Sequence, residues 1–258
     1  VPRHGSHNNA AASRPGTSGV PVVKEEQYPA ERPEPGVLMP LIGMLDDPMN
    51  QCQKPLYLPL TQEGNVIVYG SAGSGKTTFL TTMCYSLLKH YTAQEVNLYL
   101  LDFGSEVLKC FAQAPQVGDV LFSYEREKVV NLFKMLTAEI ERRKKVCAEY
   151  GGDFLSMVRQ GGEEMPSIVV GIQNYSGFSE NFDDLEEQVS YLTREGTKYG
   201  IYFVLTALTT NAVRYRMMQN FRQLLVLQLN DQSEYSGILG SVGGTYPAKM
   251  KGRGILKG

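Results

Sequence analysis

Residues 66–80, with the sequence VIVYGSAGSGKTTFL, decide how this chain folds. They open with four β-branched or aromatic residues, which is typical of a buried strand. A loop with three glycines follows, and Lys-Thr-Thr then leads into apolar residues at helical spacing. Strand, glycine-rich loop and helix succeed one another in the order that the pattern G-x-x-x-x-G-K-[ST] requires, so the stretch is a P-loop rather than a chance glycine-rich turn.

The residue types of this loop suit the binding of a nucleotide. Glycines let the backbone turn its N–H groups inward around a phosphate, and the helix N-terminus adds its partial positive charge. Lys76 can reach the β- and γ-phosphates, while the Thr77 hydroxyl is placed to ligate Mg²⁺. We therefore predict a site for ATP and Mg²⁺, with Thr77 on the metal and the nucleotide held by Gly70, Ser71, Ala72, Gly73, Ser74, Gly75, Lys76, Thr77 and Thr78.

Apolar β runs and amphipathic helical stretches alternate along the chain after the first 37 residues. The pattern predicts strands at residues 55–58, 66–69, 97–102, 167–172, 202–206, 224–229 and 254–256. It predicts helices at residues 76–90, 125–150, 185–199 and 213–220. Such alternation is typical of an α/β fold with a mostly parallel sheet and crossover helices.

The two ends of the sequence bear on domain organisation. Residues 1–37 are rich in Pro, Gly, Ser, Asn and Ala, and we interpret them as the remnant of an expression tag and a flexible lead-in. Residues 38–258 then form a single P-loop NTPase domain. The abrupt end after a predicted strand indicates a module of a longer protein. Because no stretch approaches the roughly 18 apolar residues of a membrane span, we expect this domain to make no direct membrane contact.

Charge and histidine content exclude several classes of function. The chain has 25 Lys and Arg against 27 Asp and Glu, whereas proteins that grip nucleic acid over their surface usually carry a basic excess. His4 and His7 lie in the segment that resembles a tag, which leaves His90. Catalytic triads and histidine-ligated metal centres are therefore nearly excluded.

The acidic element of a P-loop hydrolase is missing from its expected place. Such enzymes need an apolar strand that ends in Asp, usually with a Glu beside it. The candidate strand ends instead in Gln173 and Asn174, whose amides carry no negative charge and accept no proton near neutral pH. Loss of a general base typically lowers the reaction rate by about 10²- to 10⁴-fold. We therefore predict nucleotide binding with weak or absent hydrolysis.

Asp102 is an alternative source of an acid. It ends the predicted strand 97–102, and neighbouring strands of a parallel sheet bring their C-terminal ends to the same crevice. Asp102, or Glu106 after it, would then replace the missing carboxylate, unless Asp102 caps the turn that follows its strand. The candidate catalytic residues are thus Lys76, Gln173, Asn174 and Asp102.

Several blocks outside the loop carry a family resemblance. They are IGMLDDP at 42–48, LYLLD at 98–102, EIERR at 139–143, REG at 194–196 and GIYFVLT at 200–206. With these blocks the chain resembles, from about residue 41 to 256, the FtsK/SpoIIIE-type ATPase modules, and among them the second or third tandem module of the type VII secretion ATPases EssC and EccC. The resemblance implies a RecA-like P-loop NTPase whose mostly parallel sheet carries helices on both faces.

The same resemblance implies a role. It points to an ATP-binding module at the cytoplasmic face of the cell membrane that supports or regulates export of WXG100-type proteins. Its partners would be those secreted substrates, neighbouring ATPase modules of the same chain and other secretion-system components. An arginine finger reaching a neighbouring module would come from Arg194, Arg214 or Arg222.

Two other functions stay open at this point. One is a DNA translocase motor, although the charge balance argues against DNA as a partner. Leu208 also stands where the DNA pumps of the family carry a polar glutamine. The other is a docking platform with a vestigial P-loop. The pair Gln173-Asn174, where active members have Asp-Glu, argues against strong hydrolysis and so weakens the DNA-motor interpretation.

Overall fold

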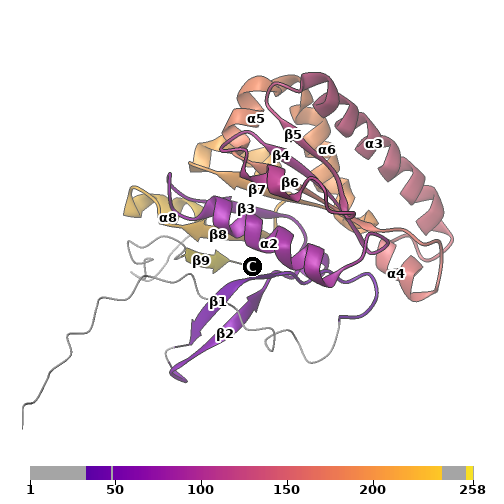
Figure 1. The fold of residues 1–258 in the computed structure, drawn as a ribbon, viewed down its shortest axis with the longest axis horizontal. Coiled ribbons are helices and arrows are strands. Elements are labelled where there is room, and N and C mark those ends of the chain that lie inside the picture. The colour runs from indigo at the N-terminus through magenta and orange to yellow at the C-terminus, as the bar shows by residue number, and fades with distance from the viewer. Residues whose placement is uncertain (1–32, 48, 240–253, 258) are drawn as a thin grey trace, which may run out of the picture. The chain divides into compact units, whose positions relative to one another are not determined.

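A seven-stranded sheet organises the computed structural model, which describes residues 33–47, 49–239 and 254–257 (Figure 1). The strand order is β5-β4-β6-β7-β3-β8-β9, and every neighbouring pair is parallel except β8 and β9. The strands are β3 (Val66–Tyr69), β4 (Val96–Asp102), β5 (Val117–Phe122), β6 (Ser167–Gln173), β7 (Ile201–Ala207), β8 (Gln223–Leu227) and β9 (Gly254–Lys257). The predicted tag lies outside the described residues, and the predicted domain limits stay a prediction.

Helices cover both faces of the sheet, and its central strands are mostly apolar. All residues of β3, β6, β7 and β8 are buried, as parallel strands covered on two sides require. The helices are α1 (Leu60–Glu63), α2 (Lys76–His90), α3 (Arg126–Ala148), α4 (Phe154–Arg159), α5 (Tyr175–Asn181), α6 (Glu186–Glu195), α7 (Tyr215–Met218) and α8 (Gln232–Leu239).

The alternation of side chains along each strand divides the core into two clusters. On β3, Ile67 and Tyr69 join the cluster that contains side chains of α3 to α8, while Val66 and Val68 join the cluster of α1 and α2. Successive residues of a strand point to opposite faces, so each strand feeds both clusters. The predicted RecA-like α/β fold, with helices on both faces, is confirmed.

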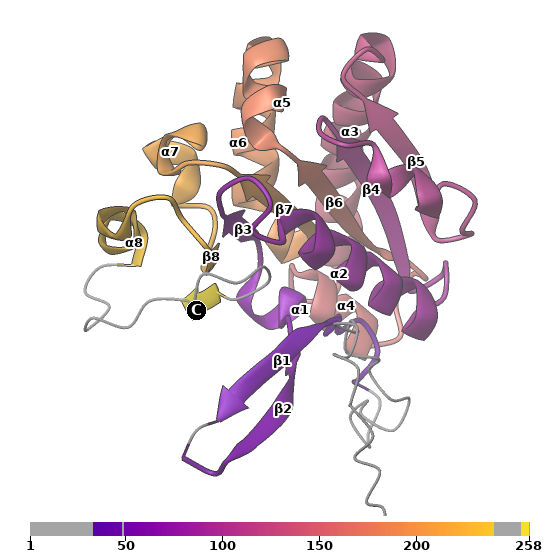
Figure 2. The same cartoon turned by 60° about the vertical axis from the view of Figure 1, so that its left-hand side comes forward.

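An antiparallel hairpin stands apart from the main sheet. It consists of β1 (Leu41–Asp47) and β2 (Cys52–Tyr57), and Figure 2 shows it projecting below α1. The hairpin is attached to α2 by the Leu41 N–H, which donates to the Ser86 hydroxyl at 2.8 Å. The predicted strand 55–58 therefore belongs to this hairpin and not to the parallel sheet. No helix among the described residues has the length and apolar character to cross a bilayer.

Candidate nucleotide-binding site

The P-loop connects β3 to α2, as its sequence predicts. Gly73 and Gly75 have φ of 74° and 110°, in the left-handed region that only glycine enters without strain. A Cβ atom on Gly70 would collide with the Ser74 side chain. The loop is also fixed from the sheet, because the Gly70 N–H donates to the Ala207 carbonyl of β7 at 3.0 Å. The loop glycines are thus required by the backbone conformation.

Lys76 folds back over the loop from which it projects. Its Nζ donates to the Gly70 and Ser71 carbonyls at 2.6 Å and 2.8 Å. The side chain is 9% exposed, and this burial lowers the pKa of the ammonium group. An ammonium group held by neutral carbonyls keeps its charge available to an arriving phosphate, which is a stronger partner than a carbonyl.

A pocket of about 270 Å³ opens in front of the loop, at the C-terminal ends of β3, β4, β6 and β7. Ligands of open α/β sheets bind at this edge. The lining residues are Ala72, Gly73, Gly75, Lys76, Thr77, Thr78, Gly104, Ser105, Gln173, Asn174 and Leu208. Eight predicted site residues therefore come together here, whereas Gly70, Ser71, Ser74 and Asp102 do not line the pocket.

Gly104 and Ser105 line the pocket although the sequence analysis did not select them. They lie two and three residues after the end of β4, whose register places Asp102 opposite Gln173 of β6. The rule that placed Asp102 near the crevice applies equally to the residues after it, so this signal was present in the sequence. Leu208, which follows β7, is 40% exposed and gives the pocket an apolar side chain.

Gln173 joins three elements through hydrogen bonds. Its Nε2 donates to the Thr77 hydroxyl of α2 at 2.8 Å. Its Oε1 accepts from the Thr206 hydroxyl of β7 at 3.1 Å. The amide thus occupies the end of β6 where a hydrolytic P-loop enzyme carries a carboxylate, and it contacts the hydroxyl predicted to ligate Mg²⁺.

Asn174 holds the turn between β6 and α5. Its φ of 64° is left-handed, a conformation that asparagine tolerates better than most residues. The side-chain oxygen accepts from the Gly177 N–H at 3.4 Å, and the side-chain nitrogen donates to the Phe103 carbonyl at 3.2 Å. Both ends of the amide are therefore engaged with backbone groups.

Asp102 caps the segment that follows its own strand. It is 1% exposed, and its two oxygens accept from the Gly104 N–H at 3.0 Å and the Leu108 N–H at 3.1 Å. This geometry matches the capping interpretation of the sequence. Glu106 is exposed at the start of the following 3-10 helix, with a left-handed φ of 60°. The hydrolytic role of Asp102 stays a prediction.

The side chains present do not form a strong magnesium site. Magnesium prefers oxygen ligands and is usually held through carboxylates and phosphate oxygens. Thr77 supplies a hydroxyl, but no carboxylate lines this pocket, and the described residues contain no group of three or more His, Cys, Asp or Glu placed to hold a metal ion. The group that faces the Thr77 hydroxyl is the amide nitrogen of Gln173. This nitrogen is a hydrogen-bond donor and cannot act as a ligand to a cation.

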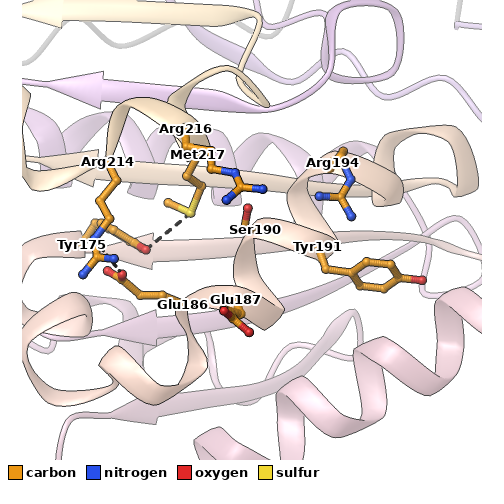
Figure 3. A pocket seen from close by; sticks show the side chains of 9 residues that line it. All are labelled: Tyr175, Glu186, Glu187, Ser190, Tyr191, Arg194, Arg214, Arg216 and Met217. Carbon is orange, nitrogen blue, oxygen red and sulfur yellow. Dashed lines mark hydrogen bonds and ion pairs between the residues drawn. The ribbon is translucent and has the colours of Figure 1, made fainter.

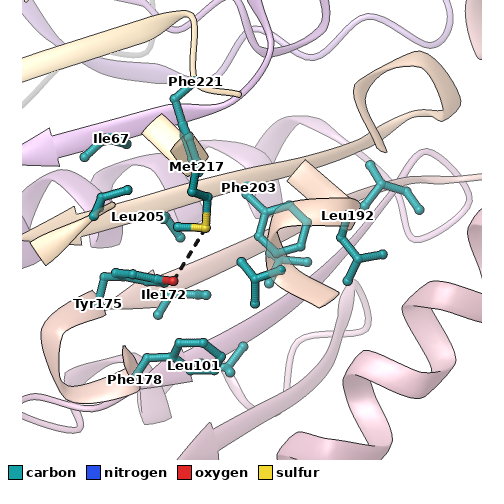
Figure 4. Packing of buried hydrophobic residues seen from close by; sticks show 14 of the residues in the cluster. Ile67, Leu101, Ile172, Tyr175, Phe178, Leu192, Phe203, Leu205, Met217 and Phe221 are labelled. Carbon is teal, nitrogen blue, oxygen red and sulfur yellow. Dashed lines mark hydrogen bonds between the residues drawn. The ribbon is translucent and has the colours of Figure 1, made fainter. Parts of the chain in front are cut away.

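A second pocket, of about 340 Å³, lies between α5, α6 and α7 (Figure 3). It is lined by Tyr175, Glu186, Glu187, Ser190, Tyr191, Arg194, Arg214, Arg216 and Met217. Tyr175 and Met217 are buried members of the larger core cluster, and the tyrosine hydroxyl contacts the methionine sulfur at 3.6 Å (Figure 4). Burial raises the pKa of Tyr175, so this phenol stays neutral.

Charged side chains surround that apolar floor. Arg214 Nε lies 3.1 Å from Glu186 Oε2, and the Arg194 guanidinium stands 5.7 Å from the centre of the Tyr191 ring. Two of the three predicted arginine-finger candidates thus line one pocket. The third, Arg222, lies 3.5 Å from Glu63 and lines a different pocket, which Arg194 also borders. Their predicted action on a neighbouring module stays a prediction.

Comparison with known proteins agrees with this geometry. The chain is 32% identical over 197 residues to the ESX secretion system protein YukB of Bacillus subtilis and 30% identical over 202 residues to the type VII secretion system protein EssC of Staphylococcus aureus. These matches cover 76% and 77% of the chain but 13% and 14% of the relatives. The chain therefore spans about one seventh of their length.

Solved structures show the same fold. ATPases 2 and 3 of EssC from Geobacillus thermodenitrificans match with a TM-score of 0.80 and 27% identity, over 90% of this chain and 44% of that one. The corresponding pair from Thermomonospora curvata EccC, in complex with a signal sequence peptide, matches with a TM-score of 0.77 and 27% identity over 88% and 42%. Since the FtsK/SpoIIIE family model matches residues 21–243, the chain belongs to the FtsK/SpoIIIE family.

Proposed function

We propose that this chain is a nucleotide-binding module of a type VII secretion ATPase, which binds ATP with weak or absent hydrolysis and so supports or regulates export of WXG100-type proteins. The observation that carries the proposal is a complete P-loop pocket in which Gln173 contacts Thr77 where a hydrolytic enzyme has a carboxylate. The relatives named above give the secretion context.

Binding and hydrolysis depend on different parts of the site. Phosphate capture needs the loop backbone, the start of α2 and Lys76, all of which are in place. Hydrolysis needs a group that accepts a proton from water and a carboxylate that positions the metal. Gln173 and Asn174 cannot accept that proton, and the Asp102 carboxylate is committed to two backbone N–H groups.

The proposed cellular setting follows from the relatives. They are secretion-system proteins about seven times longer than this chain, and the solved examples contain two ATPases in one polypeptide. We place this module at the cytoplasmic face of the cell membrane, next to further ATPase modules of the same chain. Thr77 is the one predicted metal ligand, so any magnesium that arrived with ATP would be held by the phosphates and the Thr77 hydroxyl alone.

Calorimetry and phosphate release on the purified chain test the proposal together. We expect ATP binding that disappears in Lys76→Ala, and turnover well below about 1 s⁻¹, the lower end of typical enzyme rates. Lys76→Ala removes the charge that faces the phosphates and serves as the control for both signals. Lys76-dependent turnover at or above that rate would contradict the weak-hydrolysis part, and Asp102→Asn would then test whether Asp102 supplies the acid.

A docking platform for a peptide is the second candidate. The pocket between α5, α6 and α7 favours it, because an apolar floor with charged groups around it suits a peptide with mixed side chains. The EccC relative with a bound signal sequence peptide shows that one member of this group binds such a ligand. The two candidates differ in what ATP does to stability, because only a nucleotide-binding module is stabilised by ATP.

A further inference from the structure

A chain of hydrogen bonds behind the P-loop links Asn174, Thr206, Gln173 and Thr77. The Asn174 backbone N–H, which can only donate, lies 2.9 Å from the Thr206 hydroxyl oxygen. That hydroxyl accepts this hydrogen on one lone pair and donates its own hydrogen to Gln173 Oε1 at 3.1 Å. The carboxamide is thereby oriented, and it turns its nitrogen toward Thr77.

The orientation of Gln173 decides what surrounds the Thr77 hydroxyl. The Nε2 hydrogen points at the Thr77 oxygen from 2.8 Å and occupies one of its lone pairs. A cation bound to that oxygen would face the positive end of the amide dipole, with no carboxylate from the lining residues to offset it. Gln173 is itself buried, and two hydroxyl groups hold it in this position.

The same residues lower the need for a metal ion. When a carboxylate stands beside the phosphates, a divalent cation is needed to offset the repulsion between the two anionic groups. Here that charge is absent, while Lys76 and the N-terminus of α2 supply positive charge. The positive charge at the site therefore suits a polyphosphate anion that carries no metal ion.

We propose that this site binds ATP as the free polyphosphate anion, with an affinity that does not depend on magnesium, and that Gln173 is the residue that determines this. The inference rests on the proposed function, since it requires ATP to bind at the P-loop. The form of the ligand that the pocket selects is then ATP without magnesium.

The test measures the ATP dissociation constant by calorimetry in excess magnesium chloride and in EDTA. For the unmodified chain we expect the two values to agree within about threefold. Gln173→Glu keeps the shape of the side chain and adds a negative charge next to Thr77. It should weaken binding in EDTA by about tenfold or more, and magnesium should restore the affinity. Gln219→Glu makes the same change at an exposed residue after α7 and should behave like the unmodified chain.

Each remaining outcome contradicts the inference, either alone or together with the proposed function. Binding by the unmodified chain that tightens tenfold or more with magnesium would overturn this inference and leave the proposed function standing. Equal affinity of Gln173→Glu in both buffers, with its unfolding transition intact, would overturn the role of Gln173. No Lys76-dependent binding in either buffer would overturn the proposed function and this inference together.

Discussion

Arg143 shows how a single residue joins distant segments of this fold. The side chain is 1% exposed and lies in the C-terminal part of α3. Its nitrogens donate to the Tyr199 carbonyl at 2.9 Å, the Pro166 carbonyl at 2.6 Å and the Glu139 carboxylate at 2.9 Å. These carbonyls belong to the segments that enter β7 and β6. Arg143 therefore fixes the starts of the two central strands whose other ends form the nucleotide pocket.

We predict that Arg143→Met lowers the free energy of unfolding by about 2–4 kcal/mol, because two buried carbonyls lose their charged donor. Chemical denaturation measures the change. Arg142→Met is the matched control, since Arg142 has the same carboxylate partner in Glu139 but is exposed, and it should cost less than about 1 kcal/mol. Equal losses in the two variants would contradict the anchoring role of Arg143.

The residue scale also shows what sequence could predict about the site. The P-loop was predictable because glycine, lysine and threonine at that spacing typically form a phosphate-binding loop between a strand and a helix. The roles of Asn174 and Asp102 were less accessible. Whether a polar side chain at a strand end faces a ligand or a backbone N–H depends on the path of the next segment, which local sequence does not specify.

Helices and strands could be predicted where specific residues mark both of their ends. The strand 66–69 and the helix 76–90 coincide with β3 and α2 because glycines separate them and the helix ends at His90. The strand β5 was missed because Gly118 and Asp119 interrupt its apolar run. Gly118 is required there because the Tyr99 ring of the neighbouring strand occupies the space of a Cβ. The predicted helix 185–199 proved to be α6 between two 3-10 turns.

Gly200 controls how the α6 segment passes into β7. Its φ is 75°, and a Cβ there would lie 2.8 Å from the Phe154 ring. We predict that Gly200→Ala costs about 1–3 kcal/mol in the free energy of unfolding, from backbone strain and overpacking.

Gly237→Ala is the control for that substitution. Gly237 lies within α8, and nothing lies within 4 Å of its would-be Cβ. Alanine should stabilise this helix by about 0.5–1 kcal/mol. Thermal unfolding of the two variants under identical conditions compares them. A loss at Gly237 as large as that at Gly200 would show that glycine is not specifically required at the junction.

At the scale of the whole molecule, ligand binding and folding are linked. ATP that binds the folded chain at about 100 times its dissociation constant should raise the free energy of unfolding by about 2.7 kcal/mol. The rise in unfolding temperature should be absent in Lys76→Ala, and we expect it to be the same in EDTA as in magnesium. A docking platform with a vestigial P-loop would show no shift with ATP in any of these samples.

The fold class could be predicted from the alternation of strands and helices, whereas the order of the strands in the sheet could not. The P-loop strand β3 lies between β7 and β8, which are far from it in sequence. The packing of the helices selects this order, because the central strands β3, β6, β7 and β8 are all buried on both sides and would each fit several positions.

The division of the core into two clusters has a consequence for how such a module changes over generations. Substitutions that are far apart and share no contacts add nearly independently, so the two faces of the sheet are free to drift at different rates. The face with α2 can stay fixed by nucleotide binding, while the face with α5, α6 and α7 accumulates new side chains around its charged pocket. One ancestral module could in this way give rise to several modules that keep the same ligand but meet different neighbours.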